Sequence, residues 1–405
     1  MSKVTNQASL KRILCRYDSP EWLGEVLMRA VGKATPQSIV DLGSGGGALS
    51  IAALARWNPS ELYTVDLDKN ASEEIIGALS LYKNLSHYHL NIDLMQTLPL
   101  NPFASIAGSV DLVVSNPPYR SAQWNPELDL ILEQAGFPKP STLCGDIPTD
   151  LIFVAQALNL VRPGGSVGLI LPDSMISGKA MTPFRQALVK EHRITRVIQL
   201  PRRAFKGTDA QTYVVVLERG KSSLPVRLDR ILDNNAWMQS IEISIDSASL
   251  RMDHGFHFQN RLLKKNDRKS LRDLGVEVRR GTLSSNELAQ SPHPTFHTCN
   301  FPPNLGAGVD LQGPELTQEE TGVWAEKGDI LLARVDRNLE RKIAFVAKGQ
   351  AKLSDCVLRI RCPRQLQQKV LNGLISKDGQ GQISARVRGT GARHISVSAL
   401  LDILV

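Results

Sequence analysis

The sequence predicts an α/β protein: a doubly wound, seven-stranded sheet covered by helices, followed by a smaller α+β domain. Two observations support this prediction. Between residues 36 and 220, short apolar runs alternate with helical patterns, which is typical of a parallel sheet with helices on both faces. After about residue 222, short β-rich runs lie between loops with Gly, Pro and Asn. A chain of 405 residues is long enough for two domains that each bury a core.

The first expected element is a helix that begins at Ser19-Pro20, because serine can cap a helix and proline suits its first turn. Apolar residues follow at helical spacing, at positions 23, 26, 27, 30 and 31. Helices are also expected in most intervals between strands, for example over residues 73–82 and 149–161. Strands of the large sheet are expected at residues 38–41, 61–66, 87–92, 110–115, 166–171, 195–200 and 211–219. Strands of the second domain are expected at residues 276–278, 329–335, 343–346 and 356–360.

The sequence divides into a first domain over residues 1–222, connecting strands with a basic linker over 223–272, and a second domain over 273–405. Residues 1–200 carry 17 Lys and Arg against 18 Asp and Glu, which gives a net charge of −1. Residues 201–405 carry 31 against 22, which gives +9. A single basic run is equally consistent with a solvated surface. A whole basic half favours a polyanionic partner.

Composition excludes several classes of protein. Hydrophobic residues make up 42% of the chain, which is typical of a globular protein and not of a disordered one. No stretch approaches 18 consecutive apolar residues, so no membrane partner is expected. The five cysteines are scattered without a Cys-x-x-Cys pair, which supports neither a disulfide framework nor a metal site. This cysteine usage indicates a reducing, cytoplasmic setting.

A glycine-rich turn follows the first expected strand. Residues 40–47 read Val-Asp-Leu-Gly-Ser-Gly-Gly-Gly, and Gly43 and Gly45 let the backbone bend sharply and approach a ligand. The spacing also satisfies a dinucleotide fingerprint, with Asp66 about 20 residues further on for a ribose. However, Asp41 would repel a pyrophosphate and suits a ligand with a positive end, such as S-adenosylmethionine. A tight turn without a ligand is the alternative.

Acidic residues also end the next two expected strands. Asp66 and Leu67 follow the second strand, where the carboxylate can accept both hydroxyls of a ribose and the leucine can pack on an adenine. Asp93 and Leu94 follow the third strand, where Asp93 can accept from an adenine amino group. An aspartate at a strand end is often only a cap or turn residue. The spacing of about 20 residues in the sequence between the glycine turn and Asp66 is what favours a ligand there.

An Asn-Pro-Pro-Tyr sequence directly follows the apolar strand at 110–115. Pro117 and Pro118 prevent helix and ladder hydrogen bonds and hold the loop rigid. The Asn116 amide oxygen and the Pro117 carbonyl can then accept both hydrogens of an exocyclic amine, which favours a more nucleophilic nitrogen. Tyr119 offers a face on which a planar group can stack. A purely structural Pro-Pro turn is the alternative.

In this order, these elements resemble those of S-adenosylmethionine-dependent amino-methyltransferases, specifically the γ-class N6-adenine DNA methyltransferases, over most of residues 15–220. The resemblance implies a Rossmann-like methyltransferase sheet, S-adenosyl-L-methionine as the cofactor, and methyl transfer to N6 of an adenine flipped out of double-stranded DNA. Residues 17–20 are similar to the family's cofactor-contacting Thr-Pro segment. Residues 149–153, 162–165 and 171–174 are similar to its later motifs.

Residues 203–206 resemble the family segment whose aromatic side chain packs on the flipped adenine, although Phe205 by itself is typical of a core residue. The resemblance implies no metal. It implies these catalytic residues: Asn116, Pro117, Pro118 and Tyr119. It implies these cofactor-binding residues: Ser19, Asp41, Gly43, Gly45, Asp66, Leu67, Asp93 and Leu94. The residues implied to stack on the target base are Tyr119 and Phe205.

A weaker resemblance covers about residues 275–405. The segments 324–334, 343–346, 354–357, 389–390 and 394–396 are similar to target-recognition domains of type I restriction specificity subunits. Those subunits carry two such domains, and one copy is recognised here. The resemblance therefore implies a single DNA-recognition module fused to the methyltransferase, with separate restriction or defence-system subunits as possible partners.

Three alternatives stay open at this point. Asn-Pro-Pro-Tyr serves amides as well as bases, so the substrate could be a protein glutamine or ribosomal RNA. The glutamine enzymes usually place their extra domain before the methyltransferase, whereas the extra residues here follow it. A non-catalytic DNA-binding subunit is the third alternative, and the intact Asn116–Tyr119 and Asp41–Gly47 segments argue against it.

Overall fold

The computed structural model describes residues 19–32, 35–68, 71–79, 82–96, 102–139, 146–233, 236–263, 268–313, 321–389 and 393–405. The chain divides into two compact units, Met1–His254 and Gly255–Val405, and each is described by itself. No helix among the described residues is long and apolar enough to cross a membrane.

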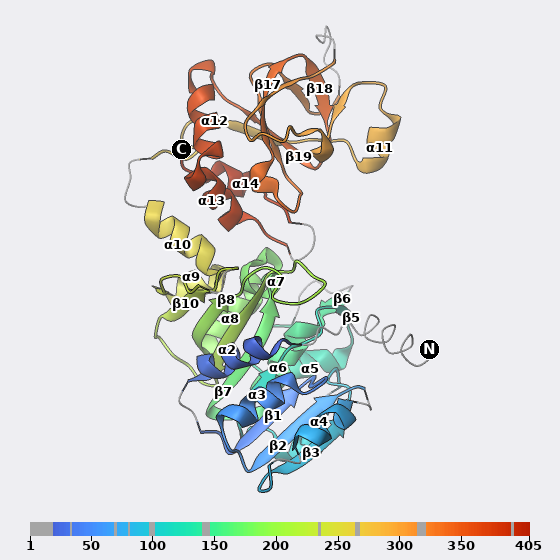
Figure 1. Ribbon diagram of the computed structural model, residues 1–405, viewed down its shortest axis with the longest axis vertical. Coiled ribbons are helices and arrows are strands. Elements are labelled where there is room, and N and C mark those ends of the chain that lie inside the picture. Colours follow the sequence, from blue (N-terminus) through green and yellow to red (C-terminus); the bar gives the residue numbers. More distant parts are fainter. Residues whose placement is uncertain are drawn as a thin grey trace. The chain divides into compact units, whose positions relative to one another are not determined.

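The first unit is built on a nine-stranded sheet with helices on its two faces (Figure 1). The strand order is β11-β10-β8-β9-β7-β4-β1-β2-β3. The strands are β1 (Ser38–Leu42), β2 (Glu61–Asp66), β3 (Ser86–Asn91), β4 (Val110–Ser115), β7 (Val161–Pro172), β8 (Arg193–Gln199), β9 (Thr212–Glu218), β10 (Val226–Arg230) and β11 (Ile241–Ile243). The predicted α/β class is confirmed, and all seven expected strands are present.

Two strands extend the sheet beyond the prediction. β10 pairs in parallel with β8, and β11 pairs antiparallel with β10. Residues 226–243, expected to connect two domains, therefore belong to the sheet of the first unit. β11 is only three residues long, and so short a strand gives little periodic signal in the sequence.

The helices of the first unit lie before, between and after the strands of this sheet. They are α2 (Glu21–Val31), α3 (Ala48–Arg56), α4 (Ala71–Leu79), α5 (Pro126–Gln134), α6 (Thr149–Leu160), α7 (Asp173–Ser177), α8 (Thr182–Glu191) and α9 (Ile245–Leu250). A core on one face of the sheet joins α2, α3 and α4 to β1, β2 and β4, and it includes Leu23, Leu27, Ile39, Leu62 and Leu112. Burying such side chains contributes about 1.5–3 kcal/mol each to folding. The central strands β1 and β4 are almost continuously buried, which explains their apolar sequences.

The strand order determines where a ligand can bind. From β1 the chain proceeds outward through β2 and β3, and then returns to place β4 on the other side of β1. Because β1, β2, β3 and β4 are parallel, their carboxyl ends lie at the same edge. Ligands of open α/β sheets bind at such a reversal of strand order. Further along the sheet, β9 lies between β7 and β8 and is antiparallel to both.

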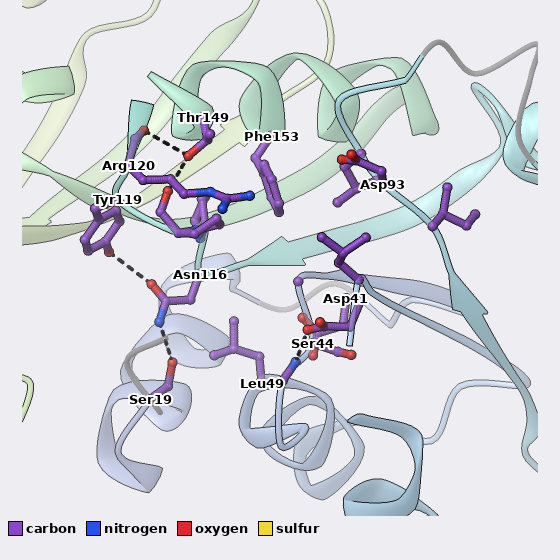
Figure 2. A pocket seen from close by; sticks show the side chains of 18 of the residues that line it. Ser19, Asp41, Ser44, Leu49, Asp93, Asn116, Tyr119, Arg120, Thr149 and Phe153 are labelled. Carbon is purple, nitrogen blue, oxygen red and sulfur yellow. Dashed lines mark hydrogen bonds between the residues drawn. The ribbon is translucent and has the colours of Figure 1, made fainter. Parts of the chain in front are cut away.

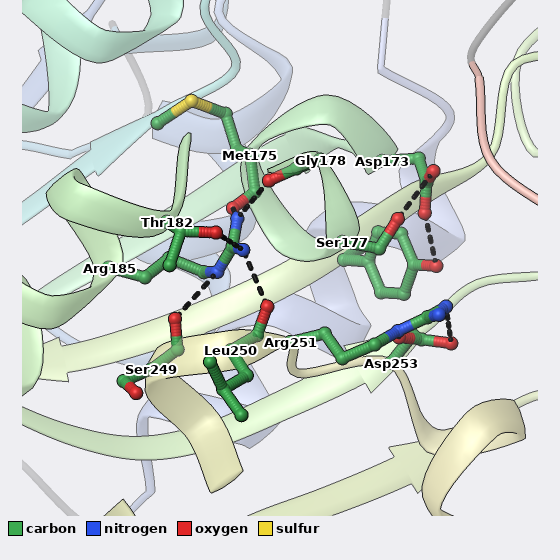
Figure 3. A network of polar contacts seen from close by, with 11 residues as sticks. Asp173, Met175, Ser177, Gly178, Thr182, Arg185, Ser249, Leu250, Arg251 and Asp253 are labelled. Atoms are coloured by element: carbon green, nitrogen blue, oxygen red, sulfur yellow. Dashed lines mark hydrogen bonds and ion pairs between the residues drawn. The ribbon is translucent and has the colours of Figure 1, made fainter. Parts of the chain in front are cut away.

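A buried arginine connects the helices beyond β7 (Figure 3). Arg185 is fully buried, and its guanidinium donates to the carbonyl oxygens of Met175, Gly178, Ser249 and Leu250 at 3.1, 2.9, 3.3 and 2.6 Å. These bonds tie α7, α8 and α9 together. A buried charge requires such partners, because removing it from water without new hydrogen bonds is strongly unfavourable. We interpret Arg185 as structural.

The second unit contains two small sheets with short helices. The larger sheet has the order β12-β19-β16-β17-β14 and the smaller one β13-β18-β15. Its strands are β12 (Glu277–Arg280), β13 (Thr295–Phe296), β14 (Gly308–Asp310), β15 (Trp324–Glu326), β16 (Ile330–Ala333), β17 (Ile343–Lys348), β18 (Gln350–Leu353) and β19 (Val357–Arg361). Its helices are α11 (Ser285–Gln290), α12 (Gln367–Ile375), α13 (Lys377–Arg386) and α14 (Val397–Leu401), and α10 (His254–Leu263) spans the division between the units. Each of the four expected strands has a counterpart, in β12, β16, β17 and β19.

Candidate active site

A cavity of about 320 Å³ lies at the carboxyl edge of the sheet, beside the ends of β1, β2 and β4 (Figure 2). Every residue predicted for the site lines this cavity, except Phe205. They are Ser19, Asp41, Gly43, Gly45, Asp66, Leu67, Asp93, Leu94, Asn116, Pro117, Pro118 and Tyr119. The fold therefore brings together five sequence segments, from Ser19 to Tyr119.

The glycine turn adopts a backbone conformation that other residues rarely adopt. Gly43, Gly45 and Gly47 have φ angles of 71°, 52° and 76°. A Cβ on Gly43 would lie 3.1 Å from the ring of Phe153, and a Cβ on Gly47 would lie 2.4 Å from Ile75. The turn thus needs glycine both for its left-handed φ values and for close packing.

Asp41 is buried beneath this turn. Its carboxylate accepts hydrogen bonds from the backbone N–H and the hydroxyl of Ser50, at 3.1 and 2.7 Å, which fixes the start of α3. Burial raises the pKa of Asp41 to about 7, although the bonds from Ser50 oppose the rise. Among the described residues that line the cavity, the one basic side chain is that of Arg120, which is exposed. A cationic ligand group would favour the ionised form of Asp41.

Asp66 connects the glycine turn to the end of β2. Its Oδ2 accepts from the Gly45 N–H and its Oδ1 from the Asp68 N–H, both at 2.8 Å. Asp93 accepts similarly from the N–H of Met95 at 3.0 Å. Each carboxylate oxygen has a further lone pair, so these bonds are compatible with a ligand donor. The roles of Asp66 and Asp93 toward a ribose and an adenine stay predictions.

One polar group of the turn has no protein partner. The hydroxyl of Ser44 is buried, lines the cavity and has no hydrogen-bond partner among the described residues. A buried hydroxyl without a partner costs about 1–3 kcal/mol, which a bound polar ligand can remove. Together with the buried acid Asp41 and the close-packed glycines, Ser44 fits a ligand that has both cationic and hydrogen-bonding groups.

Asn116 is held from both sides, as Figure 2 shows. Its Nδ2 donates to the hydroxyl of Ser19 at 3.0 Å, and its Oδ1 accepts from the hydroxyl of Tyr119 at 3.0 Å. The Tyr119 hydroxyl also lies 3.1 Å from the carbonyl oxygen of Ile170. Ser19, predicted as a cofactor contact, therefore also orients the catalytic candidate. An amide oxygen can accept two hydrogen bonds, so the bond from Tyr119 is compatible with a second donor.

The surroundings of Tyr119 keep its hydroxyl protonated. Burial raises its pKa well above the ordinary value, and the nearby carboxyl of Asp150 raises it further. Burial also raises the pKa of Asp150, to about 6. Tyr119 lines the cavity while its hydroxyl is anchored, and its stacking on a base stays a prediction.

Nine residues of the cavity lining were not predicted to have a role, and Arg120, Thr149 and Phe153 are three of them. The hydroxyl of Thr149 donates to the Pro118 carbonyl oxygen at 2.5 Å and lies 3.1 Å from that of Arg120. The Thr149 N–H donates to the Arg120 carbonyl oxygen at 2.9 Å. Thr149 thus holds the loop that follows Asn116. The family resemblance of residues 149–153 was the available signal for Thr149 and Phe153, and no pattern singled out Arg120.

Phe205 is not brought to the cavity. It is 2% exposed and packs in the core of the first unit, whose members include Leu200, Ala204 and Ile231. Its role in stacking on a target base stays a prediction. Residues 17 and 18 of the Tyr-Asp-Ser-Pro segment, and Thr390 of the second unit, lie outside the described residues.

The sheet, the glycine turn and the polar cavity define a class I S-adenosylmethionine-dependent methyltransferase fold. The family model described as N-6 DNA Methylase matches residues 11–270, and the chain belongs to this family. S-adenosyl-L-methionine is the methyl donor that this membership implies.

Similar proteins include a restriction methylase subunit and a glutamine methyltransferase. The type I restriction enzyme MpnII methylase subunit of Mycoplasma pneumoniae is 25% identical over 219 residues, covering 51% of this chain and 40% of that protein. A release factor glutamine methyltransferase of Bifidobacterium longum is 29% identical over 164 residues, covering 37% and 51%. The chain thus spans about half the length, or less, of these relatives. The crystal structure of the type IIG restriction endonuclease BpuSI matches with a TM-score of 0.54 at 15% identity, covering 95% of this chain and 57% of that one, which supports the fold.

Proposed function

We propose that this protein methylates N6 of an adenine in double-stranded DNA, at a specific site, within a restriction-modification or related defence system. The observation that carries the proposal is the arrangement of Asn116 to Tyr119 at the edge of the same cavity as Asp41 and the glycine turn. Family membership and the restriction-modification relatives support DNA as the substrate. A base inside a duplex is out of reach of such a cavity, so the adenine is extruded.

The cofactor-binding part of the proposal assigns one task to each side chain. The carboxylate of Asp41 faces the positive end of S-adenosylmethionine. The Ser44 hydroxyl forms a hydrogen bond with a polar group of the same cofactor. Asp66 accepts from the ribose hydroxyls while it holds Gly45, and Asp93 accepts from the adenine amino group. Leu67, Leu94 and Phe153 provide apolar contacts for the ring. The bound cofactor supplies an electrophilic methyl group on a sulfonium.

The catalytic part rests on Asn116 and Pro117. Their oxygens accept the two N6 hydrogens of the target adenine, which orients the nitrogen and increases the share of its lone pair available for bonding. The cofactor, held by Asp41, Asp66 and Asp93, would supply its methyl group to this nitrogen, and the N6 proton that is displaced would leave to solvent. Ser19 and Tyr119 fix the amide of Asn116 beforehand, so little reorganisation is needed during transfer. Pro118 keeps the loop rigid.

We further propose that residues 261–405 recognise the DNA sequence and bind its backbone. The basic excess of residues 201–405 supports this, because cations that neutralise phosphates release counterions and make binding sensitive to salt. Partner subunits are proposed by analogy with the MpnII relative, which is named a subunit. Scattered cysteines favour a cytoplasmic location.

Methylation of a protein glutamine is the second candidate, because three of the curated relatives are release factor glutamine methyltransferases. The experiment compares methyl transfer from labelled S-adenosylmethionine to duplex DNA, ribosomal RNA and release factor. Long-read sequencing of the DNA then maps N6-methyladenine. We expect transfer to DNA at one recurring sequence. Transfer to release factor or RNA, with none to DNA, contradicts the proposal.

A further inference from the structure

Arg120 is a cation that the proposed reaction does not yet use. Among the residues that line the cavity it is the basic one, and the charged residues beside it in the lining are the acids Asp41, Asp66 and Asp93. Its side chain is exposed and extends along the cavity toward Phe153, as Figure 2 shows. Its guanidinium has no hydrogen bond or ion pair that is recorded with any described residue, although many arginines of this chain have one.

The backbone of Arg120 is fixed more firmly than its exposure suggests. Its N–H donates to the Pro118 carbonyl oxygen at 3.0 Å, and its own carbonyl oxygen accepts from the Thr149 N–H at 2.9 Å. The next residue begins β5 (Ser121–Gln123), which pairs with β6 (Asp146–Pro148). These bonds fix the backbone of Arg120 beside the catalytic loop, so its side chain starts from a defined point at the cavity and reaches a ligand through its own rotatable bonds.

We propose that Arg120 binds a phosphate of the DNA strand that carries the target adenine. This inference rests on the proposed function. A guanidinium presents paired N–H donors that match two oxygens of a phosphate, and such bonds are among the strongest in proteins. Arg120 follows Tyr119 directly and lines the same cavity as Asn116. A ligand of Arg120 therefore lies near the amide that accepts hydrogen bonds from the target amine. A nucleotide whose base enters the cavity brings its own phosphates to the cavity's exposed margin, where Arg120 stands.

A carboxylate has the same chemistry as a phosphate, and S-adenosylmethionine carries one. The exposure of Arg120 favours the phosphate. Arg120 is exposed, whereas Asp41 and Ser44, the groups that fit the cationic and polar end of the cofactor, are buried. The experiment separates the two ligands directly.

The test uses the full-length protein and a duplex that carries its mapped methylation site. Arg120→Gln removes the charge, Arg120→Lys keeps the charge without the paired donors, and Arg29→Gln is the matched control. Arg29 is exposed on α2, and among the described residues its recorded ion pair is with Glu25, one helical turn away. The first measurement is DNA affinity over a series of salt concentrations. The second repeats it with duplexes in which one phosphate near the target adenine is replaced by a neutral methylphosphonate. The third is calorimetry with S-adenosylmethionine.

We expect Arg120→Gln to weaken DNA binding about tenfold, the range of a hydrogen bond to a charged group. The slope of log affinity against log salt should fall by about 1, since one phosphate contact is lost. One methylphosphonate position should weaken wild-type binding and leave Arg120→Gln unaffected, which is the coupling expected of direct partners. Arg120→Lys should retain the salt slope with lower affinity. Cofactor affinity and the Arg29→Gln control should match wild type.

Two results overturn the inference while the wild-type protein still methylates DNA. One is a variant with an unchanged salt slope and the same response to every methylphosphonate as wild type. The other is weaker binding of S-adenosylmethionine with unchanged DNA affinity, which assigns Arg120 to the cofactor carboxylate. Failure of the proposed function itself would look different, because wild-type protein would then neither methylate the duplex nor discriminate its site.

Discussion

The cavity of the first unit and the ion pairs of the second unit use their charged residues in different ways. In the first unit, Asp41, Asp66 and Asp93 line one cavity and are held by hydroxyl and backbone N–H groups. In the second unit, arginines and lysines pair with carboxylates, as arginines of the first unit also do outside the cavity. Examples from the second unit are Arg280–Asp355, Arg359–Glu277, Arg361–Asp329, Arg393–Glu340 and Lys342–Asp336.

This difference shows why net charge is a poor measure of a binding surface. Residues 201–405 carry nine more basic than acidic residues, yet several of their arginines already have internal partners. Such a guanidinium stabilises the unit and has fewer donors left for a phosphate. In the first unit, by contrast, the carboxylates of Asp41, Asp66 and Asp93 line a cavity that a ligand can occupy. If this comparison is right, substitutions in the cavity change ligand binding and catalysis, and substitutions of the paired arginines change stability.

The largest expected effect is on the chemical step. Asn116→Ala should lower the rate of methyl transfer by about 10²–10³, because it removes an oriented acceptor at the reacting nitrogen. Cofactor affinity should change little, since Asn116 is proposed to contact the amine. Single-turnover transfer and calorimetry measure the two quantities. Transfer within a few-fold of wild type would remove Asn116 from the mechanism.

Asp41 should make cofactor binding depend on pH. Its pKa is raised to about 7, so it is largely neutral below that pH and ionised above it. A cationic ligand needs the carboxylate, and affinity should therefore rise about tenfold per pH unit up to pH 7 and then level off. Without ligand, the raised pKa lowers stability as the pH rises. The free energy of unfolding falls between about pH 4 and 7, as Asp41 ionises more readily in the unfolded chain than in the fold, and it stays lower above pH 7.

Calorimetry from pH 5.5 to 7.5 measures this dependence. Asp41→Asn should bind weakly, with a flat profile. The matched control is Asp150→Asn, because Asp150 is also buried and its pKa is raised to about 6, but it does not line the cavity. That variant should keep the wild-type profile. A wild-type affinity that is constant over this range would refute the contact between Asp41 and a cationic group.

Thr149 should act by positioning the catalytic loop. Thr149→Val keeps the shape of the side chain and loses the hydroxyl that donates to Pro118, so kcat should fall about three- to tenfold, the range of one neutral hydrogen bond. Thr149→Ser should restore most of the rate. Cofactor affinity and melting temperature serve as controls. Equal losses in both variants would contradict a role for the hydroxyl.

The sequence predicted the cavity better than it predicted the contacts around it. Strands, the glycine turn and Asn-Pro-Pro-Tyr are local patterns, and the parallel arrangement then brings their ends to one edge. Thr149 and Arg120 meet only because β5 and β6 pair, and nothing in either segment specifies that pairing. Phe205 shows the opposite limit: its stacking on the target base came from a family resemblance and stays a prediction, whereas its residue type alone is typical of the core in which the structure places it.

The smallest effect on the reaction is expected from substituting Arg361 of the second unit. This substitution tests whether the paired arginines stabilise the unit or bind DNA. The Arg361 guanidinium makes two bonds of 2.7 Å to Asp329, which is 2% exposed. Removing one partner of a buried ion pair leaves the other uncompensated, but Arg361 is itself more than one-third exposed, so water screens part of the loss.

Arg361→Gln should therefore destabilise the second unit by about 1–3 kcal/mol, which is measurable as a lower urea midpoint. Methyl transfer at low temperature, where the variant stays folded, should remain within about twofold of wild type, since the guanidinium has few donors left for DNA. Arg29→Gln, an exposed pair on one helix, should change neither quantity. A stable Arg361→Gln protein that loses DNA affinity and salt sensitivity would reverse this assignment. The paired arginines would then be part of the DNA surface, and the basic excess of this half would act directly on phosphates.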